Sequence, residues 1–205
     1  MITIFLICIL FFSVVLHECA HGWVAWRLGD PTPKLSGRLT LNPISHIDIF
    51  GTILLPILLL LMSGGNFTFG YAKPVPINPN NFKNPKKDMM WVGASGPASN
   101  LILALLIIII LKVNMITDPV YTVLLYGVFI NLILAIFNLL PIPPLDGSRI
   151  VASFLSYRQA YRYLKLERFG FLIIALLLIF RILHWFIFPL VQFIFRIFRI
   201  DLLLI

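Results

Sequence analysis

Residues 2–28 read ITIFLICILFFSVVLHECAHGWVAWRL, an apolar run of helix length that contains the pattern His-Glu-x-x-His at positions 17–21. Residues four apart share one face of an α-helix, so His17 and His21 are placed to bind one metal ion, with Glu18 beside them as a general base. Ionisable groups inside a membrane helix cost about 2.5 to 3.5 kcal/mol each. Three of them within five residues therefore indicate a functional site.

The composition is that of an integral membrane protein. Of the 205 residues, 60% are hydrophobic and 12% charged, and the mean hydropathy is +0.99. Further apolar runs cover residues 49–62, 101–111, 120–140 and 169–180. None of the runs alternates as the strands of a membrane barrel do, and several reach the length of a spanning helix with their flanks. We predict an all-α polytopic membrane protein with about four to six membrane helices.

Positive charge is in excess. Lys and Arg number 16 against 8 Asp and Glu, a formal net charge of +8. In a soluble protein this balance would suggest nucleic acid, but here the cations lie mainly between the apolar runs, where membrane topology accounts for them. We therefore expect a lipid bilayer and no nucleic acid. The first run lacks a basic leader and a cleavage signal, so we expect it to remain part of the fold.

Two histidines leave a catalytic zinc site incomplete, because three protein ligands and a water are usual. Asp146 is the strongest third ligand. It follows directly on an apolar run between Pro144 and Gly147, where non-helical backbone can line a cavity. Alternatively, Asp146 caps a helix that begins at Gly147. The other candidates are His46, Asp48, Asp118, Glu167 and His184.

Three motifs together carry a family resemblance. They are His17-Glu18-x-x-His21, Gly96-Pro97-Ala98-Ser99-Asn100, and the run Asn138-Leu139-Leu140-Pro141-Ile142-Pro143-Pro144-Leu145-Asp146-Gly147. The chain resembles the site-2 protease family of intramembrane zinc metalloproteases up to about Arg149. It is most similar to the compact microbial branch, and we expect no PDZ or CBS domain.

The resemblance implies roles for single residues. His17, His21 and Asp146 would bind one Zn²⁺ per chain, Glu18 would be the general base, and Asn138 would assist the substrate or the oxyanion. An interhelical hydrogen bond is an equally good interpretation of Asn138. The remaining polar residues in and near the apolar runs are expected to be structural: Asn100, Asn131, His46 and Asp48, with a second metal site as the minor alternative for the last two.

The membrane topology follows from the requirement that Asp146 lie at the same depth in the bilayer as His17 and His21. An odd number of crossings must then separate Leu28 from Val120, and residues 89–111 supply one. Residues 49–62 are therefore predicted to be re-entrant, interfacial or a tight pair, with breaks at Gly51 and Pro56. This arrangement places most cations on the metal side, opposite Lys112, which indicates that the site is nearer the cytoplasmic face.

The segment after this apolar run is predicted to be short and β-like. Phe67, Phe69 and Tyr71 alternate with small residues, which is typical of strand packing. We favour a second interpretation, an edge that pairs with an unwound substrate.

We expect a single domain over 1–205, with a catalytic core to about residue 150 and a basic segment and membrane helix over 151–205. The predicted function is zinc-dependent cleavage of a transmembrane helix of a protein substrate in the cell membrane. The rival functions are a proton- or metal-coupled transporter that uses the buried His, Glu and Asp groups, and a metal-binding pseudoprotease without activity. Substrate, trigger and oligomeric state do not follow from the sequence.

Overall fold

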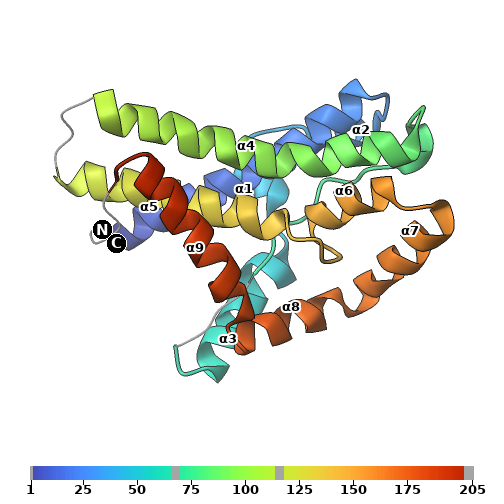
Figure 1. Cartoon of the computed structure of the whole chain (residues 1–205). Coiled ribbons are helices and arrows are strands. Elements are labelled where there is room, and N and C mark those ends of the chain that lie inside the picture. Colours follow the sequence, from blue (N-terminus) through green and yellow to red (C-terminus); the bar gives the residue numbers. More distant parts are fainter. Residues whose placement is uncertain (1, 66–69, 114–117, 201–205) are drawn as a thin grey trace.

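The computed structural model describes residues 2–65, 70–113 and 118–200, and within them every regular element is helical (Figure 1). The predicted all-α class is confirmed. Three helices are long and apolar enough to cross a membrane: α1 (Ile2–Arg27), α4 (Pro85–Val113) and α5 (Asp118–Asn138). The pair α8 (Gly170–Ile179) and α9 (Ile182–Ile197), bent by 74°, forms a fourth span if it is counted as one. The described part thus reaches the lower end of the predicted number.

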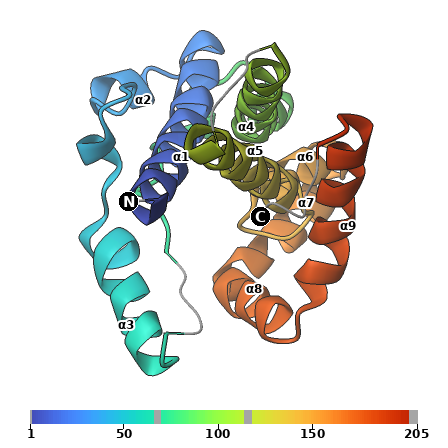
Figure 2. The same ribbon diagram turned by 90° about the vertical axis from the view of Figure 1, so that its left-hand side faces the viewer.

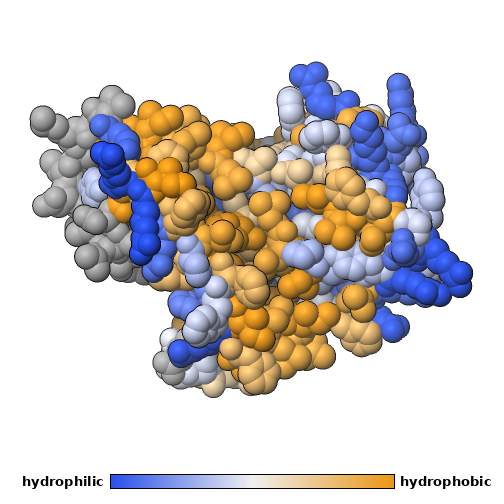
Figure 3. All heavy atoms as spheres, viewed as in Figure 1, coloured by the Kyte–Doolittle hydropathy of each residue, from blue (hydrophilic) through white to orange (hydrophobic). Residues whose placement is uncertain are grey.

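Helices α1, α4 and α5 lie side by side and form the body of the molecule, and α9 packs across α5 (Figures 1 and 2). The core shared by α4, α5 and α9 contains Leu125, Val128, Val191 and Phe195, each at most 1% exposed. Many other Leu and Ile side chains face outward. In Figure 3 they form an apolar band between two polar ends, which is the surface expected of a protein surrounded by lipid.

Residues 49–62 form a short helical segment, a π-helix (η2, Ile49–Leu54) followed by α3 (Leu55–Met62). Fourteen helical residues span about 21 Å, less than the about 30 Å of a bilayer core. This length agrees with a segment that does not cross. The chain returns past it without strand structure in residues 70–78, where the Tyr71 amide donates to Gly51 O at 3.0 Å. Phe67 and Phe69 lie outside the described residues.

Short elements join these helices. They are α2 (Thr32–Leu35), η1 (Pro43–His46), η3 (Pro79–Asn81), α6 (Asp146–Phe154), α7 (Tyr157–Leu164) and η4 (Lys165–Phe169). The non-helical residues 139–145 between α5 and α6 begin where Pro141, Pro143 and Pro144 exclude a continued helix. That break lets α6 start beside α1 and α4.

A buried carboxylate fixes the end of α1. Asp30 is fully buried and accepts hydrogen bonds from Thr32, from the Asn78 amide at 2.7 Å and from Asn81 Nδ2 at 2.6 Å. Burial alone would raise the pKa of Asp30, but these hydrogen bonds to its charged form lower the pKa below its ordinary value. Asp30 thereby ties residues 78–81 to the end of α1.

Candidate metal centre

Three potential metal ligands converge between α1 and α6. His17 and His21 are one turn apart on α1, and Asp146 is the first residue of α6. The two histidine Nε2 atoms are 3.0 Å apart, and Asp146 Oδ2 lies 3.1 Å from Nε2 of His17 and 3.2 Å from that of His21. Ligands about 2.0 to 2.1 Å from a tetrahedral zinc ion are about 3.3 Å from one another. The three donor atoms are therefore spaced as a zinc site requires.

The opposite nitrogens of both rings face carbonyl oxygens. Nδ1 of His17 lies 2.6 Å from Asn100 Oδ1, and Nδ1 of His21 lies 2.7 Å from the backbone oxygen of Val92. Because a carbonyl oxygen only accepts, each Nδ1 carries a proton, and in the neutral form each ring would present a lone pair at Nε2. Two lone pairs and a carboxylate oxygen then meet at one point. A cation relieves the repulsion among them.

A polar network inside the three-helix body holds Asn100 in this orientation. Its amide nitrogen donates to Asn131 Oδ1 at 2.9 Å and to the backbone oxygen of Ser13 at 3.3 Å. Asn131 in turn donates to Ser13 Oγ at 2.9 Å and to Gly127 O at 2.8 Å. With its nitrogen engaged, Asn100 directs its oxygen at His17. Asn100 and Asn131 are thus structural, as expected, and through Asn100 their hydrogen bonds extend to the candidate ligand His17.

Two further observations show that the site fits a metal. Asp146 Oδ2 is buried, and no described residue donates a hydrogen bond to it. Gly96 of α4 lies so close to the rings that a Cβ atom there would be 2.6 Å from His17 Nε2 and nearer still to His21 Nε2. Leu145, rather than Asp146, occupies the N-cap position of α6. The geometry thus favours ligation by Asp146 over capping.

Glu18 and Asn138 line the same cavity as the three ligands. The cavity has a volume of about 480 Å³, and Arg149 and Glu167 also line it. Glu18 Oε2 accepts the backbone amide of Val75 at 2.8 Å, which holds the carboxylate against residues 74–77. Asn138 donates from Nδ2 to Leu134 O of its own helix at 2.9 Å.

The other candidate ligands that the structure describes are not grouped with these three donor atoms, although Glu167 lines the same cavity. Asp48 caps η2 by accepting the Gly51 amide at 2.7 Å, Glu167 pairs with Arg149 at 2.8 Å, and His184 stacks on Phe188. The side chain of Asp118 is outside the described part of the structure. Among the described residues only His17, His21 and Asp146 group as a metal site.

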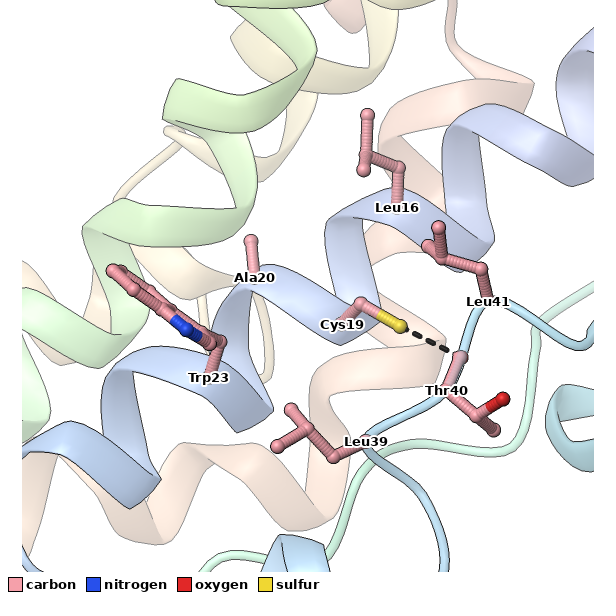
Figure 4. Close-up of a pocket in the computed structure, with 7 residues that line it drawn as sticks. All are labelled: Leu16, Cys19, Ala20, Trp23, Leu39, Thr40 and Leu41. Atoms are coloured by element: carbon pink, nitrogen blue, oxygen red, sulfur yellow. Dashed lines mark hydrogen bonds between the residues drawn. The ribbon is translucent and has the colours of Figure 1, made fainter.

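His46 is buried beside a different face of α1. Its Nε2 atom and the Cys19 thiol both contact the backbone oxygen of Thr40, at 2.9 and 2.8 Å. Figure 4 shows Cys19 directed at Thr40 in a mainly apolar groove that Trp23, Leu39 and Leu41 also line. Cys19 and His46 thus hold the loop after α1 in place, which is the role expected for His46.

The sequence analysis did not place three groups at the site: the Val92 carbonyl, the Val75 amide and Gly96, which it named only as part of a motif. The first two are backbone atoms, for which the side chains give no signal. Gly96 did have a signal, because a glycine before Pro97 within an apolar helix indicates close packing.

Comparison with known proteins places the chain. The model of peptidase family M50 matches residues 5–120 and 112–181. A candidate zinc metalloprotease of Bacillus subtilis, YwhC, is 39% identical over 184 residues, 85% of this chain and 80% of the relative. The candidate zinc metalloprotease Rip2 of Mycolicibacterium smegmatis is 31% identical over 85% of this chain and 69% of its own length.

An archaeal relative matches a smaller share of its own length. The zinc metalloprotease MJ0392 of Methanocaldococcus jannaschii is 29% identical over 77% of this chain and 35% of its own length. No solved structure matches the chain significantly. The family model spans the segments that carry His17, His21 and Asp146, and the chain therefore belongs to peptidase family M50, the site-2 protease family.

Proposed function

We propose that the protein is a zinc-dependent intramembrane endopeptidase whose metal ligands are His17, His21 and Asp146. The observation that carries the proposal is the convergence of two histidine lone pairs and a carboxylate oxygen within 4.8 Å, in a cavity that Glu18 also lines. Membership of a peptidase family and the names of the relatives support the same chemistry.

Glu18 is the proposed general base. When bound, zinc would polarise the scissile carbonyl and acidify a water molecule. Glu18 then accepts a proton from water and passes it to the leaving amine. Its contact with the Val75 amide holds the carboxylate in the cavity, so little reorientation is needed. Asn138 has two amide hydrogens, of which one is donated to Leu134 O. An oxyanion role would require the other.

The proposed substrate is a transmembrane helix that unwinds locally. An intact helix keeps its carbonyl oxygens in internal hydrogen bonds, so an accessible peptide bond needs other backbone partners. Pro74, Val75 and Ile77 line the cavity in a non-helical conformation, and the Val75 amide contacts Glu18. We propose that the substrate pairs with this segment.

Charge supports a cytoplasmic position for the cavity. Arg149 lies in the cavity, and α7 and the start of α4 add cations at the same end of the body, where Figure 3 shows one of its two polar ends. Lys112 is at the opposite end of α4. Cytoplasmic loops carry the excess of Lys and Arg, which favours cleavage near that face of the cell membrane.

The decisive experiment uses Glu18→Gln. This variant should keep one zinc per chain, since Glu18 is not among the three ligands, and should lose cleavage. Membrane proteins that co-purify with the variant are identified by mass spectrometry. Each candidate is then reconstituted in liposomes with the wild-type protein, and its fragments are followed on gels with and without a zinc chelator.

Glu167→Gln is the matched control. Glu167 is the only other glutamate of the chain and sits at the exposed rim of the cavity, paired with Arg149. This variant should keep both zinc and cleavage. Cleavage that survives Glu18→Gln would refute the mechanism. Stoichiometric zinc without cleavage by the wild type of any trapped candidate would favour a pseudoprotease.

A further inference from the structure

A second cavity, of about 610 Å³, opens between α1 and α4 and shares no lining residue with the cavity of Glu18. Both helices are candidate membrane spans and lie side by side (Figure 2). Val24 and Leu28 form its wall on α1, and Ala94 and Ala98 its wall on α4. Trp23 and Trp91 also line it and are about half exposed, at 49% and 53%. We call this cavity the α1–α4 groove.

One end of the α1–α4 groove is positively charged. Arg27 lines it, with the guanidinium carbon 5.1 Å from the centre of the Trp23 ring and 5.9 Å from that of Trp26. Lys34 Nζ lies 4.9 Å from the Trp26 ring. Among the described residues no carboxylate pairs with either cation, and nearby Asp30 accepts hydrogen bonds from Thr32, Asn78 and Asn81 instead.

We propose that the α1–α4 groove binds an anionic phospholipid, with an acyl chain along Ala94 and Ala98 and the phosphate at Arg27, near which Lys34 adds positive charge at the Trp26 ring that both cations contact. The candidate span of α1 ends at Arg27, so the cations lie at the membrane surface and the apolar walls run into the bilayer. Tryptophan at this depth is typical of an interface. The groove thus has the polarity of a phospholipid along the membrane normal. Charge complementarity favours an anionic headgroup, since each cation near the surface adds about 1 kcal/mol.

The lipid would rest against the segment that holds a metal ligand. Ser95 lines the α1–α4 groove, donates from Oγ to Val92 O at 2.7 Å, and lies 3.4 Å from His21 Nδ1. The Val92 oxygen is the partner of His21. Packing of an acyl chain on Ala94 and Ala98 would therefore stabilise the turn of α4 that fixes His21.

Brominated lipids test the site through tryptophan fluorescence. A Trp91-only protein, made by changing Trp23, Trp26 and Trp185 to Phe, is placed in phosphatidylcholine nanodiscs. Phosphatidylglycerol or phosphatidylcholine with brominated acyl chains is then titrated in. Phosphatidylglycerol should quench Trp91 at a lower mole fraction, by about fivefold for each engaged cation. A Trp185-only protein is the matched probe, because Trp185 lies on α9, and both lipids should quench it equally.

Two variants locate the lipid. Arg27→Gln should reduce the preference for phosphatidylglycerol about fivefold, and Ala94→Leu, which fills the α1–α4 groove, should abolish it. Arg196→Gln, at the far end of α9, should leave it unchanged. Zinc content of each variant checks that the fold is retained.

Either of two results would overturn the proposal. One is equal quenching of Trp91 by both lipids, which would make the lipid there ordinary bilayer lipid. The other is efficient disulfide formation between chains carrying Ala98→Cys, which would show that a second copy covers the α1–α4 groove.

Discussion

Histidines lie at two faces of α1, two of them carried by the helix and one by η1, and they differ in chemistry. On one face His17 and His21 donate from Nδ1 to carbonyl oxygens and aim their Nε2 lone pairs at each other and at Asp146. At the other face the carbonyl oxygen of Thr40 meets Nε2 of His46, so that nitrogen carries the proton. Within the described part of the chain the remaining nitrogen of His46 is buried without a hydrogen-bond partner, and His46 belongs to no group of potential metal ligands.

The difference teaches that the position of a carbonyl oxygen decides what a buried histidine does. Where the oxygen accepts a hydrogen bond from Nδ1, the lone pair of Nε2 is left to bind a metal. Where the oxygen accepts a hydrogen bond from Nε2, as at His46, the ring holds the backbone in place as a donor. Cys19 follows the same division, since its thiol is between the two ligands in sequence but contacts Thr40 (Figure 4).

The largest effect on zinc affinity should come from Asp146, whose carboxylate lies beside both histidines. Asp146→Asn removes the negative charge at the point where the Nε2 lone pairs meet, and we expect zinc affinity to fall by more than the roughly 10- to 100-fold loss typical of outer-shell changes. Metal content after dialysis against graded zinc buffers measures it. Asp48→Asn, at a helix cap on the other side, is the control, and equal zinc affinity in both variants would return Asp146 to a capping role.

The next effect concerns the carbonyl oxygen behind His17. Asn100→Leu leaves Nδ1 of His17 without an acceptor, so the ring is free to rotate or to take the other tautomer, and zinc affinity should fall about 10- to 100-fold. The same zinc titration applies. Asn131→Leu removes only a group that orients Asn100 and should reduce affinity less, whereas the reverse order would contradict the proposed chain of contacts.

The smallest effect on zinc should come from the structural face. His46→Leu removes one buried hydrogen bond to Thr40 O, so the free energy of unfolding should fall by about 1 kcal/mol. Zinc content should stay at the wild-type level. Denaturant unfolding in detergent micelles, followed with metal analysis, separates the two quantities. Loss of zinc in His46→Leu would mean that the two faces of α1 are not independent.

Much of the site followed from side chains that are out of place in lipid. His17, Glu18 and His21 stand in an apolar run, and Asp146 follows another. The spacing of His17 and His21 predicted two ligands, and the family resemblance implied Asp146 as the third. Bringing the three together predicted that residues 49–62 do not cross, which agrees with the length of that segment. The ligand set is itself still a proposal. The assignment of Glu18 as the base remains a prediction.

What the sequence did not reveal depends on backbone groups and on tertiary packing. The Val92 oxygen and the Val75 amide have no side-chain signature. The 74° bend between α8 and α9 occurs at Arg181, which has a φ of 56°. A glycine at that position would have indicated a left-handed turn, but arginine does not. The apolar run over residues 169–180 ends where α8 ends, but it gave no indication of this bend.

The closeness of Gly96 to the histidine rings has a consequence for how this protein can vary. Position 96 has room for hydrogen alone, because any larger group would occupy the space of the ring nitrogens. In a survey of all single substitutions, Gly96 should tolerate as few replacements as the ligands themselves, although it has no donor atom to offer the metal. The candidate metal site thus depends on the lack of a side chain at Gly96 as well as on the side chains of His17, His21 and Asp146.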